Sequence, residues 1–391
     1  MFRNKLLYGR RAFVFGLGTL AGAITCTIAS RWKQPVANLI QNFEAGIRDF
    51  RVVGNTPLRD RASAKGLFYG AASGYQQLSK DPEFANHFAR ECGILVAEAG
   101  LKWKDIQPNP NTFNFQQGDW LARFARDRNM LFRGHTLIWH QALPNWFEEK
   151  VNRQNAEQIL LKHISTVAGH YAGKMHSWDV VNEAIFPADG RSDGLRKTPW
   201  LEFLGPEYIN LAFQAAAQAD PQAVLVYNEN RLDYDTPEME ARRATVLKLL
   251  ESLKSMKTPV QALGIQGHLF AEEMPFNPKK LRKFLGDVAS LGLKILITEH
   301  DVTDRKLPSD INVRDRLVAG FYEDYLDVVL DESAVIGVMT WGLSDRYTWL
   351  SSYRPRQDGL SVRPLPLDAN LNRKLAWNAI ARSFDRSLPR R

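Results

Sequence analysis

The chain has 391 residues, of which 45% are hydrophobic and 24% are charged, a composition typical of one large globular domain rather than of a disordered protein. Its formal net charge is +8, but six basic residues precede the first acid, Glu44, so the rest of the chain is nearly neutral and has no electrostatic basis for binding nucleic acid. The two cysteines, Cys26 and Cys92, do not provide a disulfide framework.

Residues 1–33 combine a basic start with an apolar run. Arg10 and Arg11 precede nineteen uncharged residues, 12–30, which include several Gly and Thr. This arrangement resembles a twin-arginine export signal, and the run is just long enough to span a bilayer. We therefore expect export to the periplasm or the cell exterior, with an uncleaved membrane anchor or a buried helix of the fold as alternatives. Any membrane contact is expected through this segment alone. Residues 34–64 are predicted to form a polar connector.

Short apolar segments alternate with helical spacing between residues 65 and 385. The apolar segments begin at residues 67, 93, 131, 178, 223, 262, 294 and 335, and helical spacing covers 207–219, 238–256 and 313–332. Strands that alternate with helices pair in parallel. Eight such units over about 320 residues favour an α/β fold of the (β/α)8 TIM barrel type, as one domain, over an open doubly wound sheet.

Polar and aromatic residues gather where the predicted strands end, which is where the loops of such a barrel build a site. One strand-end acid alone is more commonly a neighbour of a helix cap or part of a loop ion pair, but seven strand ends turn polar or aromatic together. In chain order they carry Glu98, Lys102 and Trp103; His135, Trp139, His140 and Gln141; Asn182 and Glu183; Asn228 and Glu229; Gln266 and His268; Glu299, His300 and Asp301; and Trp341, Asp345 and Trp349.

The residue types at these strand ends disfavour several kinds of catalytic site. The first strand lacks a His-x-His pair and the amides and tryptophans are poor ligands, so we expect no metal and no cofactor. A Gly-x-Ser-x-Gly motif is absent and Cys92 begins a buried strand, which disfavours a Ser or Cys nucleophile. Two carboxylates remain, Glu183 and Glu299, beside tryptophans that can stack on sugar rings. The sequence therefore predicts a glycan site.

Six motifs, in this order, resemble those of the glycoside hydrolase family 10 xylanases, over residues 65–382. They are LKW at 101–103, RGHTLIWH at 133–140, WDVVNEA at 178–184, QGH at 266–268, ITEHD at 297–301, and the W…D…W set at 341, 345 and 349. The resemblance implies a (β/α)8 barrel that hydrolyses internal bonds of β-1,4-xylan without a cofactor. We expect a monomer whose partners are xylan and xylo-oligosaccharides.

The resemblance also implies the role of each residue. Glu183 is the acid/base and Glu299 the nucleophile of a retaining endo-1,4-β-xylanase, in which one carboxyl carries a proton at near-neutral pH while the other stays ionised. Asn182 holds the sugar 2-hydroxyl, and His268 and Asp301 support the nucleophile. Further substrate contacts are assigned to Glu98, Lys102, Trp103, His135, Trp139, Gln141, Gln266, His268, Trp341 and Trp349.

Two alternatives remain, namely a retaining barrel hydrolase of another β-glycan and a non-catalytic glycan-binding protein. The sequence also departs from the family's motifs at two places. EAGLKW has Ala99 where the family has Asn, and NENR has Asn230 and Arg231 where the family has an aromatic residue and an amide. We expect both departures to remove contacts from one sugar subsite and to weaken binding of short xylo-oligosaccharides.

Overall fold

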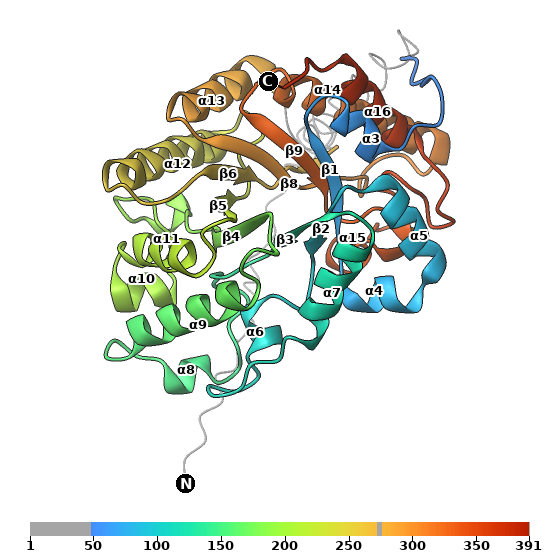
Figure 1. The fold of residues 1–391 in the computed structure, drawn as a ribbon. Helices are drawn as coiled ribbons and strands as arrows, with labels where there is room; N and C mark the ends of the chain where they lie inside the picture. The colour runs from blue at the N-terminus through green and yellow to red at the C-terminus, as the bar shows by residue number, and fades with distance from the viewer. Residues whose placement is uncertain (1–47, 272–275, 391) are drawn as a thin grey trace, which may run out of the picture. The chain divides into compact units, whose positions relative to one another are not determined.

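The computed structural model describes residues 48–271 and 276–390. Within them, eight parallel strands form a closed barrel, and helices on the outside connect consecutive strands (Figure 1). The predicted (β/α)8 barrel is thus confirmed. The barrel strands are β1 (Phe68–Ser73), β2 (Ile94–Ala97), β3 (Leu131–Gly134), β4 (Ser177–Asn182), β5 (Val224–Glu229), β6 (Ala262–Ile265), β8 (Lys294–Thr303) and β9 (Val335–Thr340).

The strand pairings close the barrel. One edge of β1 pairs in parallel with β2, and its other edge pairs in parallel with β9, the last strand. A short additional strand, β7 (His268–Phe270), follows β6 and pairs with β8, with His268 opposite Asp301. The eight predicted apolar segments are the eight barrel strands. Because all eight run in the same direction, their carboxyl ends meet at one end of the barrel.

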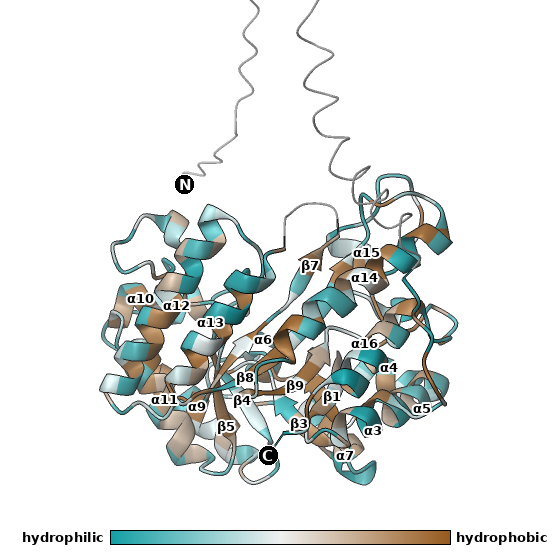
Figure 2. Cartoon of the chain, turned by 90° about the horizontal axis from the view of Figure 1, so that it is seen from above, coloured by the Kyte–Doolittle hydropathy of each residue, from teal (hydrophilic) through white to brown (hydrophobic). Residues whose placement is uncertain are grey.

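The interior of the barrel is filled by side chains from opposite strands. Val96 on β2, Val226 on β5, Leu296 on β8 and Met339 on β9 belong to one buried cluster, and each is at most 1% exposed. Since the surrounding helices cover the other face of each strand, the strands read as continuous apolar runs instead of alternating ones. Figure 2 shows β5 and β9 largely hydrophobic and the surrounding helices of mixed hydropathy.

The helices pack around this core. They are α3 (Leu58–Ser63), α4 (Tyr75–Lys80), α5 (Pro82–Glu91), α6 (Trp103–Ile106), α7 (Gln116–Asp127), α8 (Phe147–Lys150), α9 (Ala156–His170), α10 (Pro199–Leu204), α11 (Tyr208–Ala219), α12 (Pro237–Ser255), α13 (Pro278–Ser290), α14 (Ile311–Val329), α15 (Leu350–Tyr353) and α16 (Leu375–Arg386). The three predicted helical stretches correspond to α11, α12 and α14, with ends that agree within about three residues.

Four helices begin at a capping residue followed by proline. The caps of α5, α10, α12 and α13 are Asp81, Thr198, Thr236 and Asn277, and each side-chain oxygen accepts a hydrogen bond from the backbone N–H three residues later. Proline suits the first helical position because it has no N–H to satisfy, and removing such a cap costs about 1 kcal/mol. These pairs therefore fix where the helices begin.

The described chain packs onto the barrel before its first strand. Residues 58–63, at the end of the predicted connector, form α3, which packs against β1 and α16 and buries Leu58 and Ala62 completely. The predicted signal or membrane segment, residues 1–33, lies outside the described residues, so export stays a prediction. None of the helices in the described ranges is long and apolar enough to cross a membrane.

Candidate active site

The buried glutamates Glu183 and Glu299 lie at the carboxyl end of the barrel. Glu183 directly follows β4 and is 7% exposed, whereas Glu299 lies within β8 and is 5% exposed. Parallel strands place both side chains at the end where the βα loops form a site. The structure thus brings together the two carboxylates that the sequence predicted as a pair.

Glu183 is held by two neutral donors. The indole N–H of Trp139, after β3, donates to Glu183 Oε2 over 3.1 Å. The amide nitrogen of Gln266, after β6, donates to Oε1 over 2.9 Å. Neither donor carries a charge, so both hydrogen bonds orient the carboxyl group without an ion pair.

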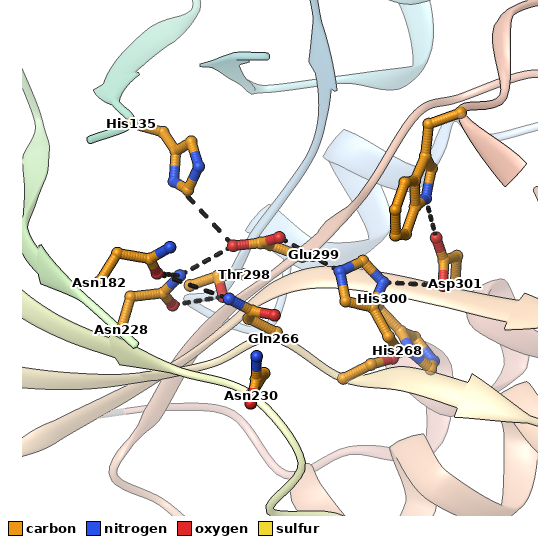
Figure 3. Close-up of polar contacts among 12 residues, drawn as sticks. His135, Asn182, Asn228, Asn230, Gln266, His268, Thr298, Glu299, His300 and Asp301 are labelled. Atoms are coloured by element: carbon orange, nitrogen blue, oxygen red, sulfur yellow. Dashed lines mark hydrogen bonds and ion pairs between the residues drawn. The ribbon is translucent and has the colours of Figure 1, made fainter. Parts of the chain in front are cut away.

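Glu299 has different partners. Its Oε1 accepts a hydrogen bond from the Asn228 amide at 2.8 Å, and its Oε2 lies 3.2 Å from His268 Nε2. The His135 ring lies 4.0 Å from Oε1 and is itself bound to Asp179 at 3.0 Å. Figure 3 shows Glu299 between His135 and Asn228 on one side and His268 on the other.

These partners set the charge of Glu299. Burial by itself raises its pKa, but the hydrogen bond from His268, the charges of His135 and His268 and the Asn228 amide outweigh burial, so the pKa lies below its ordinary value. Glu299 therefore stays ionised under conditions in which an isolated buried carboxyl would hold a proton.

His268 is oriented by an acid on its other side. Its Nδ1 lies 2.9 Å from Asp301 Oδ1, and Asp301 Oδ2 accepts the indole N–H of Trp349 at 2.8 Å. Burial lowers the pKa of His268, but the charges and hydrogen bonds of Asp301 and Glu299 outweigh it and raise that pKa well above its usual value. A protonated His268 between two carboxylates donates from both ring nitrogens.

Side-chain amides connect the two glutamates. Asn228 donates to Asn182 Oδ1 at 2.9 Å as well as to Glu299, and its own oxygen accepts the Thr298 hydroxyl at 2.7 Å. Gln266 reaches Asn182 Oδ1 at 3.5 Å as well as Glu183. Among the described residues, the Asn182 amide nitrogen has no hydrogen-bond partner and remains available to a ligand.

Asn228 was not among the predicted site residues, although it was noted at a strand end. Its position at the end of β5, between the strands that carry the two glutamates, is the signal that could have identified it. Gly264 on β6 makes its placement possible, because a Cβ at that position would lie 2.2 Å from Asn228 Oδ1. The glycine in the ALGIQ segment therefore accommodates the amide that binds Glu299.

Residues 57–383 match the Glycosyl hydrolase family 10 profile. The chain belongs to this family, and it is a glycosidase.

Individual relatives agree with this assignment. The chain is 33% identical over 332 residues to endo-1,4-beta-xylanase 1 of Humicola insolens, a match that covers 83% of this chain and 73% of the relative. It is 35% identical over 305 residues to a beta-1,4-xylanase of Dictyoglomus thermophilum, covering 75% of this chain and 82% of the other.

The fold is similar to solved structures of the family. The crystal structure of xylanase 10B from Thermotoga petrophila RKU-1 in complex with xylobiose matches with a TM-score of 0.77 and 30% identity, over 86% of this chain and 99% of that one. Native xylanase 10B from Thermotoga maritima matches with a TM-score of 0.76 and 31% identity, over 84% and 98%.

Several predicted contacts of this family 10 site lie around the glutamates. The Lys102 ammonium donates to the Glu98 backbone carbonyl at 2.7 Å and lies 5.7 Å and 5.8 Å from the rings of Trp139 and Trp341. Trp341, at 7% exposure, packs edge-on against His135 with ring centroids 5.1 Å apart. Lysine, tryptophans and histidine thus form one wall beside the carboxylates.

Two predicted substrate contacts are placed differently. Trp103 is 1% exposed and is stacked on His163 and Trp200, and its indole N–H donates to Gln107 at 2.7 Å. With its rings covered and its donor used, Trp103 supports the loop from inside instead of presenting a surface to a sugar. Gln141 lies exposed after β3, and no described contact joins it to the glutamates.

The two departures from the family's motifs follow different strands. Ala99 follows β2, next to Glu98, whereas Asn230 and Arg231 follow β5. Two strands, β3 and β4, lie between β2 and β5 in the barrel. Two strands, β5 and β6, likewise lie between β4 and β8, which carry Glu183 and Glu299, so this separation is compatible with one subsite, and the shared subsite stays a prediction. Arg231 lies 3.2 Å from Glu238 at the start of α12.

The support of Glu299 by His268 predicts a change in the pH dependence of catalysis. Attack requires ionised Glu299, so kcat/KM falls as the pH decreases through the pKa of that residue. In His268→Asn the hydrogen bond and the positive charge that lower this pKa are lost while burial, which raises it, remains. We therefore expect the acidic limb of the kcat/KM profile to move to higher pH.

The matched control is His170→Asn. His170, at the end of α9, lies 2.6 Å from Asp119, so it also forms a histidine–aspartate pair, but at the end of a helix that leads into β4. Its loss should leave the acidic limb unchanged. An unchanged limb in His268→Asn would contradict the support assigned to His268.

Proposed function

We propose that this family 10 glycosidase is a retaining endo-1,4-β-xylanase. Membership of the family supports hydrolysis of a glycosidic bond, and the relatives named as xylanases support xylan as the substrate. The xylobiose complex of a related structure supports binding of xylo-oligosaccharides.

In the proposed mechanism Glu299 attacks the anomeric carbon while Glu183 protonates the departing glycosidic oxygen. This step leaves a glycosyl-enzyme ester and a free alcohol. Esterification removes the negative charge of Glu299, and Glu183 then accepts a proton from the water that hydrolyses the ester. The Asn182 amide, whose nitrogen is available, donates to the 2-hydroxyl of the sugar being transferred. Trp341 and Trp349 supply ring surface beside that sugar.

The observation that carries the proposal is the difference between the two carboxyl environments. Glu299 is bound by an amide and by His268, a histidine whose pKa is raised, and its own pKa is lowered. Glu183 receives hydrogen bonds from the neutral groups of Trp139 and Gln266. The carboxylate beside a positive group stays ionised, which suits a nucleophile. The carboxyl group with neutral donors suits an acid/base.

Product analysis tests substrate, cleavage mode and stereochemistry together. On soluble xylan we expect reducing ends to appear with a steep early fall in viscosity, which internal cleavage produces, and NMR of the first products should show the β-anomer before mutarotation. Mixed-linkage β-glucan at equal concentration is the control. Preferential cleavage of the glucan would support the alternative of another β-glycan hydrolase, and binding without products would support a non-catalytic glycan-binding protein. First products in the α-anomer would contradict retention.

A further inference from the structure

The backbone of Glu183 has an unusual conformation. Its φ is +57°, in the left-handed region that residues with a long side chain rarely adopt. Such a conformation persists when the surrounding structure determines it. The contacts of the three residues 183–185, directly after β4, therefore show what holds this glutamate in place.

A third buried glutamate at the carboxyl end of the barrel binds this segment. Glu229, the last residue of β5, is completely buried, and its Oε2 accepts the backbone N–H of Ile185 at 3.1 Å and the Tyr227 hydroxyl at 2.6 Å. Its Oε1 accepts the backbone N–H of Asn230 at 2.9 Å. One carboxylate thus joins the main chain that follows β4 to the main chain that follows β5.

Two arginines bind the carbonyls of the same segment. Arg242 on α12, also completely buried, donates from Nη1 to the Ile185 carbonyl at 2.6 Å, and the same nitrogen lies 3.3 Å from Glu229 Oε1. Arg196 donates from Nε to the Glu183 carbonyl at 2.7 Å. The N–H of Glu183 donates to the Asn228 carbonyl at 2.9 Å. Nearly every backbone polar group of the turn therefore has a fixed partner.

We propose that Glu229 and Arg242 are positioning residues that hold the turn after β4 and thereby fix the location of the Glu183 carboxyl group. Neither residue contacts the carboxyl oxygens of Glu183, which are bound by Trp139 and Gln266. Both act through the Ile185 peptide groups. The proposal rests on the proposed function, because it assigns them to the acid/base of that reaction.

The number of accepting oxygens explains why a glutamate is suited to this position. Burial raises the pKa of Glu229 to about 7, against the opposing effects of the Arg242 charge and the Tyr227 hydrogen bond. An ionised carboxylate accepts on both oxygens, whereas an amide has one accepting oxygen and a nitrogen that only donates. Glu229→Gln keeps the volume of the side chain, but its amide nitrogen, which donates, would face a donor that a carboxylate oxygen now accepts. The turn should therefore loosen while the core stays filled.

The test compares substrates that differ in their need for acid catalysis. Glu229→Gln should lower kcat/KM on xylotetraose by about 10- to 100-fold, since a misplacement of about 1 Å can cost a hundredfold. For an aryl β-xylobioside with a dinitrophenolate leaving group, which departs without a proton, kcat/KM should fall by less than about threefold. The milder Tyr227→Phe, which removes one donor to Glu229, should show the same selectivity to a smaller degree.

Glu91→Gln is the matched control. Glu91 is also a buried glutamate that accepts a backbone N–H, from Leu58, and an indole N–H, from Trp377, and pairs with Arg373 at 2.6 Å, but it joins α5 to α3 and α16. Its replacement should lower the melting temperature, and any loss of kcat/KM should be equal on xylotetraose and on the aryl xylobioside. Melting curves for every variant separate loss of folding from loss of positioning.

The outcomes distinguish the positioning role of Glu229 from the proposed function. Equal losses on both substrates, no loss on either, or the same selectivity in Glu91→Gln would overturn the positioning role. Wild type and Glu183→Ala are assayed in the same series. If wild type does not cleave xylotetraose, or Glu183→Ala lacks the selectivity for the activated substrate, the proposed function fails. If Glu183→Ala shows that selectivity and Glu229→Gln does not, the positioning role alone fails.

Discussion

Glu299→Ala should lower kcat on xylan by at least about 10⁴-fold, because the covalent intermediate cannot form without the attacking carboxylate. The substitution leaves the amide of Asn228 and the ring of His268 without the oxygens that they bind at 2.8 Å and 3.2 Å. A small anion can occupy the space. Azide should therefore restore part of the turnover of an activated aryl xylobioside and yield the α-xylobiosyl azide, which NMR identifies.

Asp345→Asn is the control for this experiment. Asp345, after β9, is also a buried acid, and it pairs with Lys374 at 2.7 Å. Burial raises the pKa of Asp345 to about 6, against the charge and the hydrogen bond of Lys374. Its replacement can change stability but should show no response to azide. If Glu299→Ala retained wild-type turnover, or if azide gave the β-azide, Glu299 would not be the nucleophile.

The sequence predicts the barrel well because its strands are covered on both faces. Segments such as ILVA on β2 and VLVY within β5 are apolar without alternation, and this pattern, repeated at eight places between helical stretches, leaves few other folds. The same topology places strand-end residues together, so Glu183 and Glu299 could be paired although 115 residues separate them in the sequence.

Contacts between side chains were harder to predict. Trp103 stands one residue after Lys102 in the LKW motif, yet Lys102 faces the aromatic wall while Trp103 stacks on His163 and Trp200. Those two partners come from α9 and α10, and their approach depends on helix packing that no local pattern encodes. An indole that binds sugar and one that fills a core look the same in sequence.

The protonation of the histidines was also hard to predict from the sequence. His268 and His300 are both among the polar residues at the predicted strand ends. His300 is completely buried, its Nδ1 lies 2.7 Å from the Gly267 carbonyl, and burial lowers its pKa to about 4 despite the opposing contact with that carbonyl. His268, between Asp301 and Glu299, has its pKa raised. Neighbouring charges, which the sequence does not place, determine which imidazole is protonated.

The subsite expectation stays a prediction. Ala99 and the Asn230–Arg231 pair were grouped because both change motifs that the family uses for substrate contacts. Ala99 follows β2 and the Asn230–Arg231 pair follows β5, and these two strands are separated by β3 and β4. The same number of strands separates β4 from β8, whose residues Glu183 and Glu299 belong to one site, so strand order is compatible with one subsite.

Glu183→Ala should separate the two steps of the reaction. On xylotetraose, whose leaving group needs a proton, kcat/KM should fall by about 10²- to 10⁴-fold, the usual contribution of a general acid. With a dinitrophenyl β-xylobioside the first step should proceed within about tenfold of wild type, because that leaving group departs as an anion. The glycosyl-enzyme should then accumulate, since no base activates water, and a stopped-flow trace should show a burst of phenolate followed by slow turnover.

Azide gives the result that decides between the two glutamates. In Glu183→Ala, Glu299 still forms the ester, and azide attacks that ester without needing a base, so turnover should rise and the product should be the β-xylobiosyl azide of retained configuration. In Glu299→Ala the same anion attacks the substrate directly and gives the α-azide. Opposite anomers from the two variants would identify Glu183 as acid/base and Glu299 as nucleophile. The α-azide from Glu183→Ala would reverse the roles, and the absence of a burst with the activated substrate would mean that Glu183 does not assist the second step.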